Sequence, residues 1–350
     1  MSTPVVLGLD FGGTKIAAAV AELSGQRIGE TTVETDASFG ARWNLDRGLS
    51  AACVLLDDVA QDRELAAVGA CTFGIPAAYG VGLAPAIPGW EELALGHELA
   101  VMFDCSAVSL ATDVKAAAAA EAWSGSLVGY DPAIYVNLGT GLAVAIVCGG
   151  KVVSGANGAA GEIGYNLRQL SDFDLDGAER VMLEEVVSGM GLSASGQRRT
   201  GHAMTAAEVF AGEATDPRLA EVMEQFVREL CFHLANLAVA LDPSRIAVGG
   251  GMVRSWHRLE PPLRRALETA VPFPPELVVG TYPFDAPLVG VLNLALAAAR
   301  SDETSAGSLA FDARAGFTSS GRARHDGQTG PNRAPEEAPE EQSPADRAAR

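Results

Sequence analysis

A glycine-rich turn near the start of the chain carries the residue types that bind a nucleoside triphosphate. It follows the short apolar run Val5–Leu9 and consists of Asp10, Phe11, Gly12, Gly13, Thr14 and Lys15. Adjacent glycines let the backbone approach phosphate oxygens and point N–H groups at them. The threonine adds a hydroxyl, Lys15 adds a positive charge, and Asp10 has the carboxylate needed to hold Mg²⁺ through water. A plain hairpin turn is the alternative interpretation.

Two further glycine turns follow short apolar runs later in the chain. They are Gly139-Thr140-Gly141 and Gly249-Gly250-Gly251. The first is suited to the other side of a triphosphate, and the second to the nucleoside end, which would lie against bare backbone. Tight connections between elements are the alternative for both. None of the three turns fits G-x-G-x-x-G or G-x-x-x-x-G-K-[ST], so neither a dinucleotide-binding motif nor a P-loop is supported.

An aspartate stands where a predicted strand meets an alanine-rich helix. Asp113 follows Ser109–Thr112 and precedes a run of alanines. A sugar hydroxyl is a poor nucleophile, and a carboxylate in hydrogen-bond reach orients it and accepts its proton during phosphoryl transfer. The position therefore suggests Asp113 as a catalytic base, with a helix N-cap as the alternative role.

Glutamates in two later segments have the chemistry to bind a sugar. Glu162 lies in the glycine-rich, apolar segment Gly158–Tyr165, and Glu184 and Glu185 precede Ser188-Gly189. A carboxylate accepts hydrogen bonds from two neighbouring hydroxyls. For one member of the adjacent pair, a solvated helix face is the alternative.

The elements that position these residues predict a duplicated α/β fold. A strand, a glycine turn and a second strand occur at 5–20 and again at 133–148, which suggests two halves with a cleft between them. We expect a small lobe at 1–111, a larger lobe at 112–288, a helix at 289–300 that closes the first lobe, and a disordered tail at 301–350. Further strands are predicted at 66–73, 107–110 and 245–248, and helices at 43–61, 113–123 and 220–241.

Composition narrows the classes of protein. The chain has 350 residues and a formal net charge of −19, which disfavours a nucleic-acid groove because phosphate binding needs clustered Lys and Arg. Its five cysteines are scattered and form no C-x-x-C pair, as in a reduced cytosolic protein. No apolar run reaches the ~20 residues of a membrane span, and no signal peptide is evident. We expect a cytoplasmic protein that binds neither nucleic acid nor membrane.

Taken together and in this order, these motifs resemble the ROK family of sugar kinases and repressors, within the actin-like, hexokinase-like ATPase superfamily. The resemblance runs from about Val5 to Arg300. The matching segments are 9–15, 84–90, 112–113 with 116–121, 138–141, 161–164 and 249–251. The resemblance implies a two-lobed α/β fold with duplicated domains around a central cleft, and ATP-dependent phosphorylation of the 6-hydroxyl of a hexose, with ATP and Mg²⁺ as cofactors. We also expect a homodimer.

The family's motifs imply a role for each candidate residue. Asp113 becomes the base, the first two glycine turns bind phosphates, and the third binds the nucleoside. Of the adjacent glutamates, Glu184 matches the family's sugar-binding residue, because it stands four residues before Ser188 as the family's glutamate does. The implied sugar-binding set is Thr112, Asp113, Glu162, Tyr165 and Glu184.

Three positions depart from the family's pattern. The family has Asn at the positions of Ala86 and Thr112, and at the position of Tyr165 it has a His that binds sugar and a structural zinc. The stretch Leu167–Met182 contains neither Cys nor His. A zinc site needs about four such ligands, so we expect no structural zinc.

The same departures bear on the substrate. They remove amide and imidazole partners of sugar hydroxyls, which suggests a modified hexose, since unpaired buried hydroxyls cost affinity. Some family members act on amino sugars such as kanosamine (3-amino-3-deoxyglucose) in antibiotic biosynthesis, and a carboxylate-rich pocket suits an ammonium group. A glucokinase and a non-catalytic sugar-binding regulator are the alternatives. A repressor is disfavoured because the first phosphate turn already begins at Asp10.

Overall fold

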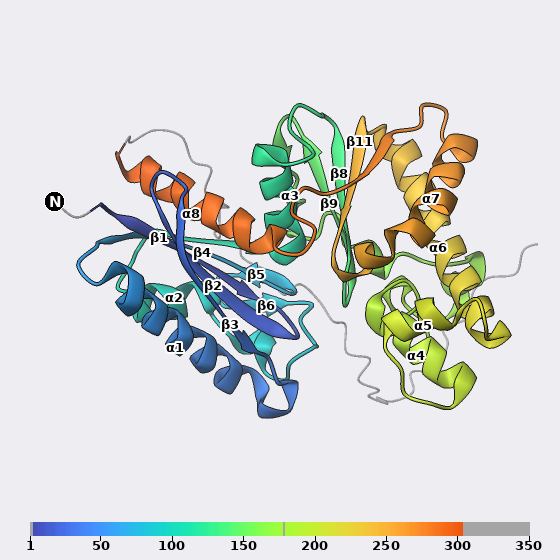
Figure 1. Cartoon of the computed structure of the whole chain (residues 1–350), viewed down its shortest axis with the longest axis horizontal. Helices are drawn as coiled ribbons and strands as arrows, with labels where there is room; N and C mark the ends of the chain where they lie inside the picture. The colour runs from blue at the N-terminus through green and yellow to red at the C-terminus, as the bar shows by residue number, and fades with distance from the viewer. Residues whose placement is uncertain (1–2, 178, 304–350) are drawn as a thin grey trace, which may run out of the picture. The chain divides into compact units, whose positions relative to one another are not determined.

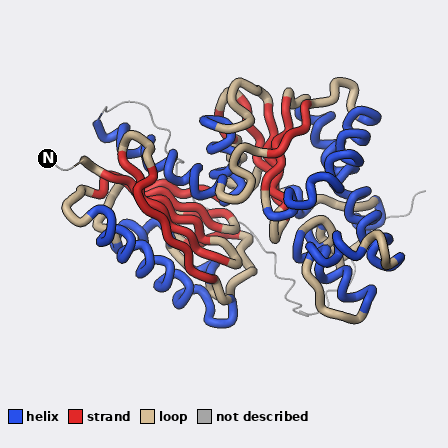
Figure 2. Tube along the Cα trace, viewed as in Figure 1, coloured by secondary structure: helices blue, strands red, loops and turns tan. Residues whose placement is uncertain are grey.

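The computed structural model describes residues 3–177 and 179–303 (Figures 1 and 2). The predicted tail, from residue 304 onward, lies outside these residues. In the part that is described, the strands form two five-stranded sheets and a two-stranded hairpin. No helix of the described ranges is long and apolar enough to cross a membrane.

The first sheet has the strand order β3-β2-β1-β4-β7. Its strands are β1 (Val5–Phe11), β2 (Lys15–Glu22), β3 (Arg27–Glu34), β4 (Leu65–Thr72) and β7 (Val108–Thr112). The predicted hairpin around the first glycine turn is confirmed, since β1 and β2 pair antiparallel from Val5 opposite Glu22 to Phe11 opposite Ile16. β1, β4 and β7 are parallel neighbours, so their carboxyl ends lie at one edge. Asp10 and Thr112 therefore lie near the same edge of this sheet.

Helices cover both faces of the first sheet. One face packs against α1 (Gly40–Ala60) and α2 (Leu95–Met102), through apolar side chains such as Leu45 and Leu99. The other face packs against α8 (Ala286–Glu303), drawn in orange in Figure 1, through a layer made mostly of alanines with Val291 and Leu292. α8 also lies directly on α3 (Asp113–Ser124): a β-carbon added at Gly290 would lie 1.9 Å from the carbonyl oxygen of Ala116.

The second sheet repeats the order of the first. Its strands are β8 (Ala133–Leu138), β9 (Leu142–Cys148), β10 (Lys151–Val152), β11 (Arg245–Gly249) and β12 (Glu276–Val279). They run β10-β9-β8-β11-β12, so in both sheets the third, second, first, fourth and fifth strands follow one another. β8 and β9 pair antiparallel around the second glycine turn, and β8, β11 and β12 are parallel. This repetition is what a duplicated fold predicts.

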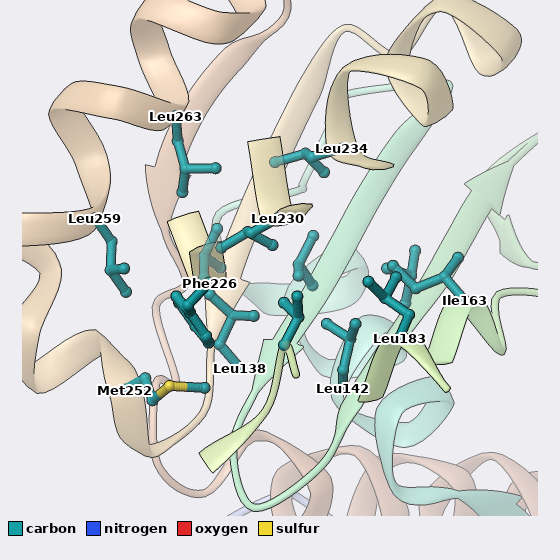
Figure 3. Packing of buried hydrophobic residues seen from close by; sticks show 14 of the residues in the cluster. Leu138, Leu142, Ile163, Leu183, Phe226, Leu230, Leu234, Met252, Leu259 and Leu263 are labelled. Carbon is teal, nitrogen blue, oxygen red and sulfur yellow. The ribbon is translucent and has the colours of Figure 1, made fainter. Parts of the chain in front are cut away.

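The large core lies on the outer face of the second sheet. There the strands pack against α6 (Pro217–Leu241) and α7 (Trp256–Ala270), with Phe226, Leu230 and Leu263 among the buried side chains (Figure 3). α3 covers the opposite face through Val114, Ala117 and Ala118. The helix that carries Asp113 is thus fixed between the second sheet on one side and α8 on the other.

The remaining elements complete the connections. They are β5 (Ile75–Ala77), β6 (Gly80–Gly82), α4 (Gly189–Thr200), α5 (Ala206–Gly212), and the 3₁₀ turns η1 (Ala37–Phe39), η2 (Trp90–Glu92), η3 (Ile163–Tyr165), η4 (Leu170–Asp174), η5 (Leu183–Glu185) and η6 (Gly251–Ser255). The predicted division at 111/112 falls within β7, one residue before the junction of β7 and α3, and as a domain boundary it stays a prediction.

Candidate active site

Asp10 lies at the carboxyl end of β1, one residue before the end of the strand. Its backbone pairs with Ala17 of β2 and Cys71 of β4. The Cys71 thiol donates a hydrogen bond to Asp10 Oδ1 at 3.3 Å. Burial, and next the negative charge of Asp113, raise the pKa of Asp10 to about 6, while the thiol and Lys15 oppose the rise. Cys71 in turn pairs with Ala111 of β7, two residues before Asp113, so the register of the sheet places Asp10 and Asp113 near the same edge.

Asp113 occupies the first position of α3, and the N-cap role belongs to its neighbour. Thr112 caps the helix, because its Oγ1 accepts a hydrogen bond from the Lys115 backbone N–H at 3.3 Å. Asp113 Oδ1 accepts one from the Val114 N–H at 2.7 Å. Burial raises the pKa of Asp113, and the Glu184 charge adds to the rise, whereas the Val114 N–H and Lys115 oppose it. The carboxyl is therefore a stronger base than an exposed aspartate.

Glu184 approaches this group from η5. Its Oε1 accepts a hydrogen bond from the Leu142 N–H at 2.8 Å, at the start of β9. The contact needs a glycine at the preceding position, because a β-carbon on Gly141 would lie 2.3 Å from the same oxygen. Glu185, in contrast, is exposed and caps its own turn through the Met182 N–H. The geometry brings Glu184, and not Glu185, to the second glycine turn.

Glu162 and Tyr165 enter from the segment around η3. Burial raises the pKa of the half-buried Glu162, and the charges of Asp113 and Glu184 add to it. Burial also raises the pKa of Tyr165, helped by Glu184, Glu162 and Glu91. Tyr165 remains 43 % exposed, which suits a residue at the rim of a binding site. Glu162 is thus within electrostatic reach of Asp113 and Glu184, and Tyr165 is within reach of Glu162 and Glu184.

The three glycine turns lie at strand ends, and the second of them contacts Glu184. In the first, Gly13, Thr14 and Lys15 are exposed. In the second, the carbonyls of Gly139 and Thr140 accept hydrogen bonds from the N–H groups at the start of α4. The third turn lies against the second, because a β-carbon on Gly250 would be 2.5 Å from the backbone of Leu138, and its Gly249 pairs with Asn137 of β8. The third turn ends at Gly251, where η6 begins.

Sequence reasoning missed two residues of this group. Cys71 is fully buried beside Asp10. Lys115 is 3 % exposed, and its Nζ donates a hydrogen bond to the Gly158 carbonyl at 2.8 Å and lies 3.9 Å from Glu162 Oε1. A lysine in an alanine-rich helix is ordinarily solvated. The available signal was its spacing, two residues after Asp113 within the first turn of the helix.

The stretch Leu167–Met182, in which we expect no structural zinc, is stabilised by an ion pair and by side-chain hydrogen bonds to its backbone. Arg168 forms a two-pronged salt bridge with Glu229 of α6. The carboxylate of Asp172 accepts hydrogen bonds from the backbone N–H groups of Arg168 and Gln169, so it is engaged within its own turn. In the described ranges no three His, Cys, Asp or Glu side chains form a group suited to a metal ion. The absence of structural zinc stays a prediction.

The two sheets have the same strand order, and each has a glycine turn between its first two strands. This arrangement is that of the two-lobed actin-like, hexokinase-like class of ATPase fold. The chain belongs to the ROK family, whose model matches residues 6–297. The fold and family predicted from the sequence are thereby confirmed.

Comparison with individual proteins gives the same grouping. The chain is 29% identical over 196 residues to a glucokinase of Halalkalibacterium halodurans, an alignment that covers 51% of this chain and 59% of that protein. It is 29% identical over 268 residues to a kanosamine kinase of Amycolatopsis mediterranei, covering 75% and 85%. Its fold is similar to the crystal structure of a ROK family glucokinase from Streptomyces griseus in complex with glucose and AMPPNP, with 26% identity, a TM-score of 0.68 and coverage of 83% and 99%. These comparisons group the chain with the ATP-dependent sugar kinases of the family.

Proposed function

We propose that the chain is an ATP-dependent hexose kinase that phosphorylates the 6-hydroxyl of its sugar. The observation that supports this is the position of Asp113. It is coupled electrostatically to Asp10, beside the first glycine turn, and to Glu184, beside the predicted sugar site. A base for phosphoryl transfer must lie within hydrogen-bond reach of the acceptor hydroxyl, beside the line along which that hydroxyl attacks the γ-phosphate.

In the proposed reaction, Asp113 orients the 6-hydroxyl and accepts its proton. The bond between the sugar oxygen and the γ-phosphorus forms as the bond between that phosphorus and the β–γ bridging oxygen breaks, and ADP leaves with the electron pair. The raised pKa of Asp113 favours this proton transfer. Glu162 and Glu184 hold neighbouring hydroxyls and fix the direction of attack.

Asp10 fits the role of a Mg²⁺ partner. Burial and a neighbouring negative charge raise the pKa of this carboxyl to about 6, and a cation beside it would offset both effects. Asp10 would hold the ion through water, with Lys15 and the turn backbone on the triphosphate. Mg²⁺ would supply charge neutralisation on the phosphates.

For the sugar itself we propose an amino hexose such as kanosamine. Ala86, Thr112 and Tyr165 lack the amide and imidazole groups expected at their positions, and Thr112 also serves as a helix cap. The site contains four carboxylates, which favours a cationic ligand. The relative from A. mediterranei named kanosamine kinase is consistent with this choice.

Glucose is the second candidate, and one contact favours it. Glu162, which would pair with a sugar ammonium, already lies 3.9 Å from the ammonium of Lys115. A neutral hexose avoids a second positive charge at that position.

An ADP-release assay coupled to NADH oxidation tests the proposal. The purified full chain with ATP and Mg²⁺ is offered glucose, mannose, N-acetylhexosamines and amino hexoses, and the product is mapped by NMR. We expect turnover with at least one hexose and phosphate on its 6-oxygen. Saturable sugar binding without turnover for any of them would identify a non-catalytic regulator instead.

A further inference from the structure

Lys115 is a buried cation in the midst of acidic groups. It projects from the first turn of α3, is 3 % exposed, and is one of only three lysines in the chain, with Lys15 and Lys151. Its Nζ is fixed by the Gly158 carbonyl at 2.8 Å. A lysine is rarely buried unless its charge is compensated.

The compensation comes from the proposed sugar-binding carboxylates. Lys115 Nζ lies 3.9 Å from Glu162 Oε1, and its charge also acts on Asp113. Burial lowers the pKa of Lys115, while Glu162 and then Asp113 raise it. Lys115 therefore neutralises part of the negative charge of the site on the side of Glu162, whereas the hydrogen bond that Glu184 accepts from Leu142 comes from a neutral backbone N–H.

We propose that Lys115 is a specificity-determining residue that disfavours a sugar ammonium beside Glu162 and favours a neutral hydroxyl there. The proposal rests on the hexose kinase function and deepens it. Two ammonium groups sharing one carboxylate repel each other, and such repulsion is a common source of specificity. A cationic hexose must then direct its ammonium toward Glu184, and a neutral hexose faces no such constraint.

The test is the ratio of kcat/KM for kanosamine to kcat/KM for glucose, measured on the full chain. Lys115→Gln removes the charge and keeps an N–H donor for the Gly158 carbonyl, and Lys115→Met removes both. We expect both changes to raise the ratio at least about tenfold, as the loss of one like charge near the ligand predicts. Because both sugars are measured on the same variant, a general loss of folding or positioning cancels in the ratio.

Two further variants complete the design. Glu162→Gln leaves the ammonium of Lys115 without its counter-charge, so the ratio should fall below that of the wild type. Lys151→Met removes a lysine that is exposed on β10, and it should change kcat/KM for neither sugar. The Glu162→Gln variant keeps the proposal testable if the Lys115 variants fail to fold.

The outcomes separate this proposal from the function on which it rests. If the wild type phosphorylates a hexose and the Lys115 variants lose both sugars equally, Lys115 has a structural role only and the inference is wrong. A Glu162→Gln ratio equal to or above that of the wild type also overturns it. If the wild type releases no ADP with any hexose, the hexose kinase function itself is wrong.

Discussion

Asp113 owes its basicity to its place at the start of α3. Burial raises the pKa of the carboxyl, and the Val114 N–H and the Lys115 ammonium limit that rise. The balance of these effects leaves the pKa of the carboxyl above its ordinary value, so Asp113 is a stronger base than an exposed aspartate. As pH falls through its raised pKa, the carboxyl gains a proton and turnover should decrease.

Asp113→Asn should fold and bind sugar but lose most turnover. The amide keeps the shape and can still orient a hydroxyl, but it accepts no proton, and loss of a general base costs about 10²–10⁴-fold in rate. Steady-state kcat and the sugar Kd are the measurements. Glu185→Gln, on an exposed carboxylate outside the group, is the matched control and should keep wild-type kcat. A kcat of Asp113→Asn near that of the wild type would exclude Asp113 as the base.

Asp10→Asn should make the nucleotide-free protein more stable. The pKa of Asp10 is about 6 in the folded protein, against 3.8 for an ordinary aspartate, so ionisation of this carboxyl opposes folding. The sign follows from linkage: below about pH 4 the wild type and the variant should be equally stable, and above about pH 6 the variant should gain roughly 1–3 kcal/mol. Urea unfolding at pH 4 and pH 7.5 measures this. A variant that is less stable at pH 7.5 would contradict the burial argument.

At the scale of elements, glycine turns and buried strands could be predicted because their signals are local. The runs around 5–20 and 133–148 are apolar and end at glycines, and the structure has hairpins there. β3 was missed because it is a polar edge strand. α7 was missed because Pro261 and Pro262 lie inside it, yet its apolar side packs on the large core. Both elements form because they pack against or pair with elements far along the chain, which a local sequence pattern does not reveal.

The candidate site shows the same division between local and distant signals. Asp10, Asp113 and the glycine turns stand at strand ends, which a sequence pattern reveals. The partners of these residues come from segments far along the chain: Cys71 lies 61 residues from Asp10, and the carbonyl of Gly158 lies 43 residues from Lys115. Such contacts depend on the tertiary fold, so no local pattern reveals Cys71, and the spacing of Lys115 from Asp113 does not by itself predict that its ammonium is buried.

The contact between α3 and α8 should tolerate no side chain at Gly290. A β-carbon there would lie 1.9 Å from the Ala116 carbonyl oxygen, and this oxygen belongs to helix backbone that cannot rotate away. Gly290→Ala should therefore destabilise the protein by about 1–3 kcal/mol, despite the better helix propensity of alanine. Asn293→Ala on the same helix is the control and should change stability by less than about 0.5 kcal/mol. Unchanged urea unfolding of Gly290→Ala would show that the helices separate at little cost.

At the scale of the whole molecule, the C-terminal part of the chain lies outside the proposed site. It also lies outside the region that matches the family. The match ends at residue 297, and α8 ends at Glu303. The predicted homodimer, the cytoplasmic location and the disordered tail stay predictions, the last because it lies outside the described residues.

A chain that ends at Glu303 should keep the kcat/KM and the melting temperature of the full chain. The segment beyond it is poor in large apolar residues and so has little surface to bury. Assay and thermal unfolding of the two purified chains make the comparison. A chain that ends before Ala286 removes α8 and should fail to fold. A large drop in kcat/KM or in melting temperature for the chain that ends at Glu303 would show that the tail contributes to the site or to the fold.

The place of α8 has a consequence for how the chain is made. The first sheet draws its strands from the first 112 residues, but one of its faces is covered by a helix that begins at Ala286. During synthesis on the ribosome, the alanine-lined face of that sheet has no partner until nearly the whole folded part has emerged. The N-terminal sheet is therefore completed last although it is translated first, and a chain arrested at residue 250 would expose this face to chaperones.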